Sequence, residues 1–289
     1  MKPYLAVILL FLKVSSGLAQ NPEFFNFRSS TSQQDVIYKN HIKTESIYEC
    51  KNNKNKLDSI LLTVIFYDTA GREILNWQYE DGIRLTWIDT LVYEKKNLVL
   101  NFSYTPRKKQ WNRIEYQYDS AGNEIMITES HSFDTLHFSA ARNVYNNKKQ
   151  LTISYINTPR DTGLYILEKY YYNDQGNLIK TDSYTREMGL IYSKTFEYNN
   201  KSKLTGEYAE NQDGRKKIYE YSYNEFDQCI SKKFFGFLSD MINTDDDEDK
   251  FSYNVNGTLS QWIRFRNDKS IILKHHYSYY TEPQGNSEK

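Results

Sequence analysis

The sequence predicts an all-β protein, an antiparallel meander of about nine tandem β-hairpins curled into a barrel or shell. Three observations predict this fold. A tyrosine recurs about every 26 residues, turn-forming residues follow it, and the flanking residues alternate between aromatic and polar side chains. The composition agrees, because 26 Tyr and 15 Phe suit a pleated, half-buried surface.

The chain opens with a segment typical of a secretory signal. Lys2 gives it a positive charge, residues 5–12 form a short apolar run, and Gly17 and Ala19 are the small residues that signal cleavage needs. We therefore expect residues 1–19 to be removed and the rest of the chain to be exported to the periplasm, the cell surface or the medium. An uncleaved anchor is the alternative. No later segment is apolar for long enough to span a membrane as a helix, so no transmembrane helix is expected after cleavage.

One tyrosine marks each repeat, and we call these nine residues the anchor tyrosines. Their spacing is 26, 25, 27, 27, 26, 25, 30 and 26 residues. The anchors are Tyr67, Tyr93, Tyr118, Tyr145, Tyr172, Tyr198, Tyr223, Tyr253 and Tyr279. Their regularity in a chain of this length predicts one structural unit per interval.

The residues after the anchors predict a turn of defined geometry. An Asp or Asn directly follows seven of the nine anchors, and its side chain can accept hydrogen bonds from the backbone of a type I turn. A Gly stands four places after four of them, where the chain needs a positive φ to enter the returning strand. The clearest turn pairs are Asp68 with Gly71, Asp119 with Gly122, Asn173 with Gly176, and Asn254 with Gly257. Asn97 takes the glycine position in the weak second unit. Lys149, Ser202 and Asp227 occupy it in three other units, so we expect those three turns to be looser or built differently.

The flanks of the turns alternate as strands do. Tyr219, Tyr221 and Tyr223 share one face of a strand, and Glu220 and Ser222 share the other. One face is therefore expected to be buried and the other to be wet. Because mid-strand charges oppose a lipid-facing surface, we take Lys194, Glu220 and Lys232 as evidence against an outer-membrane barrel.

The domain boundaries follow from the repeat. Residues 20–47 form an N-terminal segment. Tyr38 to Asn40 and Tyr48 to Cys50 could begin a degenerate first hairpin, with 52–56 as its turn or a polar loop. Residues 48–281 form the repeat domain and residues 282–289 a frayed tail. The acidic run at 244–249 is expected to be an exposed loop rather than a calcium site, because it lacks the alternating ligands and the glycine of an EF-hand.

The two cysteines leave one alternative open. Export would permit a disulfide between Cys50 and Cys229, but their separation in sequence does not show that they meet. Two buried thiols are the plainer interpretation.

The segments from Tyr116 to Asn123 and from Tyr170 to Leu178 resemble the YD repeats of the RHS family. The resemblance implies a long hairpin sheet that coils into a shell or barrel, which in large members of that family encloses a toxin domain or supports adhesion. This chain departs from the pattern, because its unit is longer, several turn glycines are missing and no self-cleavage motif or room for a toxin domain follows. The toxin-delivery role is therefore not carried over, and a small secreted YD-like protein is the nearer resemblance.

No catalytic, cofactor-binding or metal-binding motif stands out. None of His41, His131, His137, His275 and His276 has a partner at metal-ligand spacing. The 37 basic and 37 acidic residues balance, so nucleic acid is not an expected partner. Trp77, Trp87, Trp111 and Trp262 lie off the anchor columns, and exposed rings among them would mark a binding surface.

These observations favour a secreted, non-enzymatic binding or scaffold module for a glycan or a cell-surface protein. Two alternatives stay open. One is an outer-membrane or soluble β-barrel with a transport or ligand-carrying role, and the other is a hydrolase with an unrecognised site.

Overall fold

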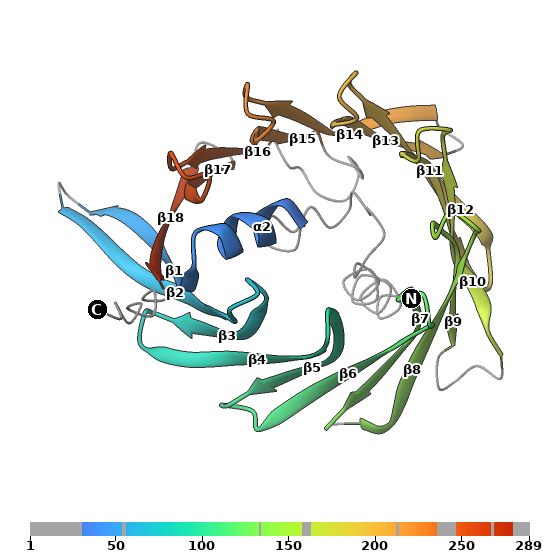
Figure 1. The fold of residues 1–289 in the computed structure, drawn as a ribbon, viewed down its shortest axis with the longest axis horizontal. Coiled ribbons are helices and arrows are strands. Elements are labelled where there is room, and N and C mark those ends of the chain that lie inside the picture. Colours follow the sequence, from blue (N-terminus) through green and yellow to red (C-terminus); the bar gives the residue numbers. More distant parts are fainter. Residues whose placement is uncertain are drawn as a thin grey trace, which may run out of the picture.

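The computed structural model is a closed barrel that, among the residues it describes, has 18 antiparallel strands and one helix at its rim (Figure 1). It describes residues 31–53, 56–132, 134–157, 163–211, 214–235, 247–266 and 269–279. The helix is α2 (Thr31–Lys39). The strands are β1 (Ile42–Asn53), β2 (Lys56–Tyr67), β3 (Glu73–Glu80), β4 (Arg84–Glu94), β5 (Asn97–Thr105), β6 (Gln110–Tyr118), β7 (Glu124–His131), β8 (Asp134–Tyr145), β9 (Leu151–Asn157), β10 (Tyr165–Tyr172), β11 (Leu178–Thr185), β12 (Gly189–Tyr198), β13 (Leu204–Asn211), β14 (Gly214–Tyr223), β15 (Cys229–Phe234), β16 (Asp247–Tyr253), β17 (Leu259–Arg266) and β18 (Lys269–Tyr279).

The meander closes on itself because its first and last strands pair. Each strand lies beside its neighbours in sequence, and β1 pairs with both β2 and β18. A hydrogen bond of 2.5 Å between the hydroxyls of Thr44 and Ser278, which are 234 residues apart, crosses this seam. The predicted fold class is therefore confirmed, and of the two shapes expected from the sequence the molecule takes the barrel. The predicted signal segment and the tail at 282–289 lie outside the described residues.

Seven rim turns share one geometry. In each, the Asp or Asn after the anchor accepts a backbone N–H from the residue three places on, at 2.9–3.0 Å, and donates its own N–H to the residue four places on. Its side-chain oxygen accepts further backbone N–H groups, as Asp68 does from Ala70 and Arg72. The seven turns begin at Asp68, Asp119, Asn146, Asn173, Asn199, Asn224 and Asn254. We call this end of the barrel the Asx rim.

The glycine position of these turns has a positive φ whatever residue fills it. Gly71, Gly122, Gly176 and Gly257 adopt φ of 73–88°, and Lys149, Ser202 and Asp227 adopt 57–61°. The turns without glycine are therefore built in the same way as the others. The prediction that they would be looser or built differently is wrong. The second unit does differ, because β4 runs to Glu94 and pairs it with Asn97 in β5, so Lys95 rather than Asn97 has the positive φ.

The anchor tyrosines stand at the ends of the even-numbered strands, where neighbouring hairpins diverge toward the Asx rim. Between β11 and β12 the last paired residues are Lys180 and Thr195. Beyond them, the hydroxyl of Tyr198 bridges the gap and donates to the backbone oxygen of Leu178 at 2.7 Å. We call such a bond a hydroxyl clasp.

Six clasps hold neighbouring hairpins together at this rim, with lengths of 2.7–2.8 Å. Their donors are Tyr118, Tyr145, Tyr198, Tyr223, Tyr253 and Tyr277. In the last hairpin the clasp comes from Tyr277, while Tyr279, the residue that the spacing selects, is half exposed. Tyr67 donates to Glu45 instead, and Tyr93 lies under the guanidinium of Arg72 at 4.6 Å.

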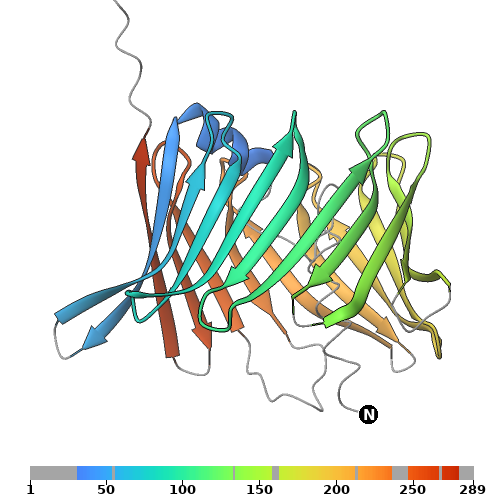
Figure 2. The ribbon, with the colours of Figure 1, turned by 90° about the horizontal axis from the view of Figure 1, so that it is seen from below.

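The N-terminal segment differs from the prediction. Tyr38 to Asn40 begin no hairpin, because they lie at the end of α2, which crosses the Asx rim inside the ring of strands (Figures 1 and 2). The first hairpin is β1–β2, and its first strand begins at Ile42 and contains Tyr48 to Cys50, as one of the two predicted starts required. A domain boundary at residue 48 therefore falls within a strand. Ile37 of α2 is buried against Ile65 and Tyr67. This contact identifies the wall face that carries Ile65 as the lumen face.

Strand register then separates the two faces of the wall. Residues paired across strands share a face, so the lumen row at the level of Ile65 continues through the polar residues Asn76, Asp89, Ser103, Asn112 and His131. The row one place along each strand lies outside, and contains Val64, Trp77, Ile88, Tyr104 and Trp111.

Several side chains lie elsewhere than expected. Lys194 and Lys232 pair with the lumen-facing residues Ala209 and Tyr221, so of the three charges taken as lipid-opposing only Glu220 lies outside. Asp247 to Asp249 belong to strand β16, because they pair with β15 and β17, whereas 244–246 fall outside the described residues. None of the four tryptophans is fully exposed, since neighbouring strands cover part of each indole.

The two cysteines do not pair. Cys50 lies on β1 with its thiol 3.8 Å from the hydroxyl of Ser59, and Cys229 lies on β15 in the largest buried cluster. Both are buried free thiols on separate strands. The plainer of the two interpretations therefore holds.

Candidate binding site

Buried carboxylates line the lumen face, each held by hydroxyl, amide or imidazole donors. Glu45, Glu124, Glu129, Glu168 and Glu207 are at most 3 % exposed. At the seam, Glu45 accepts from Tyr67 at 2.6 Å and from Tyr277 at 3.2 Å, and it contacts Nδ1 of His275 at 2.5 Å.

The same arrangement recurs around the barrel. Glu168 accepts from Tyr170 at 2.5 Å and from Ser183 at 3.2 Å, and Glu207 accepts from Tyr221. Glu124 accepts the side-chain amide of Asn143 at 3.2 Å. Since a buried carboxylate is costly without partners, these bonds explain how the acids are tolerated in the wall.

Burial dominates the protonation of these groups. Desolvation raises the pKa of Glu124 to about 7, and it also raises the pKa of Glu168 and of Glu207. Burial lowers the pKa of Lys194 to about 8, against the opposing effect of the nearby Glu207. These groups are distributed around the barrel wall and do not converge on a single point. We therefore interpret their hydrogen bonds as part of the structure of the wall.

A pocket of about 510 Å³ opens at the Asx rim, between the β8–β9 and β10–β11 hairpins. The last paired residues of β9 and β10 are Ile153 and Lys169, so the strands diverge beyond them. Tyr172 occupies the anchor position here, yet among the described residues its hydroxyl forms neither a clasp nor any other hydrogen bond. The pocket therefore lies at one of the anchor positions that lack a clasp, as Tyr67 and Tyr93 also do.

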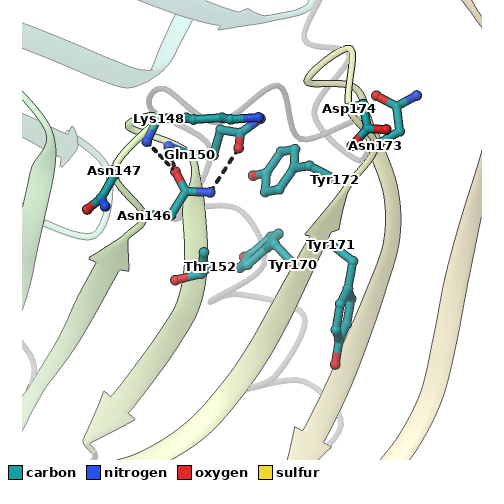
Figure 3. Close-up of a pocket in the computed structure, with 10 residues that line it drawn as sticks. All are labelled: Asn146, Asn147, Lys148, Gln150, Thr152, Tyr170, Tyr171, Tyr172, Asn173 and Asp174. Atoms are coloured by element: carbon teal, nitrogen blue, oxygen red, sulfur yellow. Dashed lines mark hydrogen bonds between the residues drawn. The ribbon is translucent and has the colours of Figure 1, made fainter.

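Amides, hydroxyls and aromatic rings line this pocket (Figure 3). Tyr170 and Tyr172 project from β10 toward the turn that begins at Asn146, while Tyr171 points away from them. The side-chain amide of Asn146 donates to Oε1 of Gln150 at 2.9 Å, which fixes the orientation of Gln150. The lining residues are Asn146, Asn147, Lys148, Gln150, Thr152, Tyr170, Tyr171, Tyr172, Asn173 and Asp174.

The pocket offers hydrogen-bond donors beside an aromatic ring. Desolvation raises the pKa of Tyr172 to about 12, so its phenol stays protonated and can donate at neutral pH. The side-chain nitrogen of Gln150 lies 3.4 Å from the carbonyl oxygen of Gly176 in the next turn, a weak bond that a ligand could displace. A concave site with few charged groups and several fixed polar groups suits a polar, neutral ligand.

Sequence reasoning placed Tyr172, Asn173 and their turn correctly in chain order but did not single out this interval. The missing clasp depends on how far two hairpins diverge, which no local motif encodes. The sequence carries only a weak indication of the lumen carboxylates. Glu168 lies two and four places before Tyr170 and Tyr172, which puts it on the same strand face as these tyrosines.

Within the part of the chain that the structure describes, no three His, Cys, Asp or Glu side chains are grouped so as to hold a metal ion. No helix among the described residues has the length and apolar character needed to cross a membrane.

Comparison with known proteins finds distant matches among solved structures. No family model matches the chain, and no curated protein matches its sequence. A crystal structure of TcdB2-TccC3-TEV is 11% identical with a TM-score of 0.31, and the match covers 78% of this chain and 16% of that one. A porin-like protein from Bacteroides uniformis ATCC 8492 is 9% identical with a TM-score of 0.34, and the match covers 82% of this chain and 98% of that one. The Photorhabdus luminescens Tc holotoxin pore is 10% identical with a TM-score of 0.29, over 82% of this chain and 18% of that one.

Proposed function

We propose that the chain is an exported, non-enzymatic binding protein whose rim pocket between β9 and β10 takes a neutral glycan. The observation that carries the proposal is the missing clasp, because among the described residues it leaves the hydroxyl of Tyr172 without a hydrogen bond beside the oriented amide of Gln150. Sugar hydroxyls are donors and acceptors at once, so they match amide and phenol groups, and a tyrosine ring offers an apolar face to a sugar ring. Export rests on the signal-like N-terminal residues, and the YD-like turns agree with a secreted repeat protein.

The pocket also has a matched control within the chain. Gln228 repeats the contacts of Gln150, since it accepts from Asn224 at 2.9 Å and lies 3.5 Å from the carbonyl oxygen of Gly257. Its neighbouring anchor, Tyr253, forms its clasp. The two glutamines therefore differ in whether the neighbouring anchor tyrosine forms a clasp.

The test is a glycan array screened with the full chain, followed by calorimetry on the best glycan. Gln150→Ala and Tyr172→Phe are each expected to weaken binding about tenfold, the effect of losing one net hydrogen bond of about 1.4 kcal/mol. Gln228→Ala is expected to leave the affinity unchanged. The proposal fails if no glycan binds, or if Gln228→Ala weakens binding as much as Gln150→Ala does.

A further inference from the structure

The outer wall of the barrel is polarised into an apolar and a charged sector. On β2–β6 two outward rows follow the register, Val64–Trp77–Ile88–Tyr104–Trp111 and Phe66–Leu75–Thr90–Phe102–Arg113. A third, shorter row adds Val92 and Leu100. We call the apolar members of these rows the β2–β6 face.

The corresponding rows on β10–β14 are polar. They read Lys169–Asp182–Ser193–Glu210–Arg215 and Tyr171–Lys180–Thr195–Tyr208–Lys217. Exposed ion pairs link them, such as Arg215 with Glu197 at 2.9 Å and Lys217 with Glu220 at 3.0 Å. Such a sector is suited to water, so lipid cannot surround the whole wall.

The β2–β6 face is open to solvent in the monomer. Its members are half-buried or exposed, with Val92 at 43 % exposure, whereas Ser103 on the lumen side of the same wall is 5 % exposed. Within the face the rings pack on one another, with 4.8 Å between the centroids of Phe66 and Trp77 and 6.1 Å between those of Phe102 and Trp111. Interfaces are rich in such aromatic residues.

The size of the face fits one half of a symmetric contact. Five strands spaced ~4.8 Å apart and three rows ~7 Å apart make an apolar patch on the order of 400 Å², the size of the largest patch on a typical monomer, which is often functional. Two such patches with their polar borders would reach roughly 1,200 Å² of buried surface, the lower end for a specific interface.

The charges at the border decide between possible occupants. Arg113 and Glu115 stand two places apart on β6 at the edge of the face and form an exposed pair at 2.5 Å. An anionic bilayer would be matched by a basic border, but this border carries both signs. In a two-fold contact, Arg113 of each copy can meet Glu115 of the other. We propose that the β2–β6 face binds the β2–β6 face of a second copy of this chain.

Two threonines provide a matched test of the contact. Thr90 stands at the middle of the β2–β6 row and Thr195 at the middle of the charged row, and both are half-buried. Thr90→Cys is expected to give a disulfide-linked dimer under mild oxidation, and Thr195→Cys is expected to remain monomeric. Sedimentation of the unmodified full chain between about 0.1 and 100 μM should show a reversible monomer–dimer equilibrium.

Charge reversal tests the orientation. Arg113→Glu should weaken the dimer about tenfold, and combining it with Glu115→Arg should restore it. A chain that is monomeric throughout this range overturns the proposal. A monomer that instead binds phosphatidylcholine vesicles through the β2–β6 face also overturns it and assigns the face to a bilayer. Equal cross-linking of the two cysteine variants overturns it as well.

Discussion

Removing a single clasp hydroxyl tests how the hairpins are held together. In Tyr198→Phe the phenol oxygen that lies 2.7 Å from the backbone oxygen of Leu178 is deleted, while the ring and its packing remain. The net contribution of such a bond is about 0.5–1.5 kcal/mol, and at this partly buried rim water can replace some of it, so we expect a loss of about 1 kcal/mol. Tyr172→Phe removes a hydroxyl that makes no bond among the described residues, so its expected cost is close to zero.

The assay is urea unfolding of both variants beside the unmodified chain, followed by circular dichroism and tyrosine fluorescence. Unfolding should shift to lower urea in Tyr198→Phe with an unchanged slope, and stay in place in Tyr172→Phe. Tyr118, Tyr198 and Tyr253 lie on separate hairpins, so a triple Tyr→Phe variant should lose about 3 kcal/mol by additivity. Equal losses in Tyr198→Phe and Tyr172→Phe would show that the clasp bonds do not contribute to stability, and would refute the reasoning.

Three further outcomes follow from the structure. Gly71→Ala should cost more stability than Gly122→Ala. Both glycines have a positive φ, but only at Gly71 would the added Cβ lie 2.9 Å from backbone atoms of α2. The urea midpoints of the two variants measure the difference. Glu124 has a folded-state pKa of about 7, above its unfolded value, so the native state holds the proton more tightly. The contribution of this proton to the free energy of unfolding is therefore complete at low pH and is lost as the pH rises from about 4.5 to 7. Glu124→Gln should remove up to about 3 kcal/mol of this pH dependence. A pH titration of the unfolding free energy in which the variant keeps the full slope would contradict the prediction. Burial raises the pKa of the Cys229 thiol to about 12, so iodoacetamide at pH 8 should modify it at least about 100-fold more slowly than a free cysteine, as mass spectrometry of the native chain can measure.

The local parts of this fold could be predicted from the sequence. An Asx side chain and a residue of positive φ four places after a tyrosine specify a turn by themselves, so Asn173 and Gly176 already contain the geometry that the structure shows. Alternation around Tyr221 assigned a buried face for the same reason, since the pleat of a strand has a period of two.

The remaining features depend on contacts between distant residues. Closure of the barrel rests on β1 meeting β18, and α2 is held by Ile37 against Ile65 and Tyr67 rather than by a strong helical pattern of its own. The pocket lies where β9 and β10 diverge beside Tyr172, which forms no clasp among the described residues. The face that a charge occupies, as for Lys194 and Lys232, could be read only after the lumen side was known.

Hydrogen exchange of the full chain with and without a saturating glycan tests the central claim most directly. Bound glycan should protect backbone amides at 146–152 and 170–174, which line the pocket, and leave the equivalent residues 224–230 and 251–255 unchanged. Protection at both sites, or at neither while calorimetry reports binding, would contradict a ligand site created by the missing clasp of Tyr172.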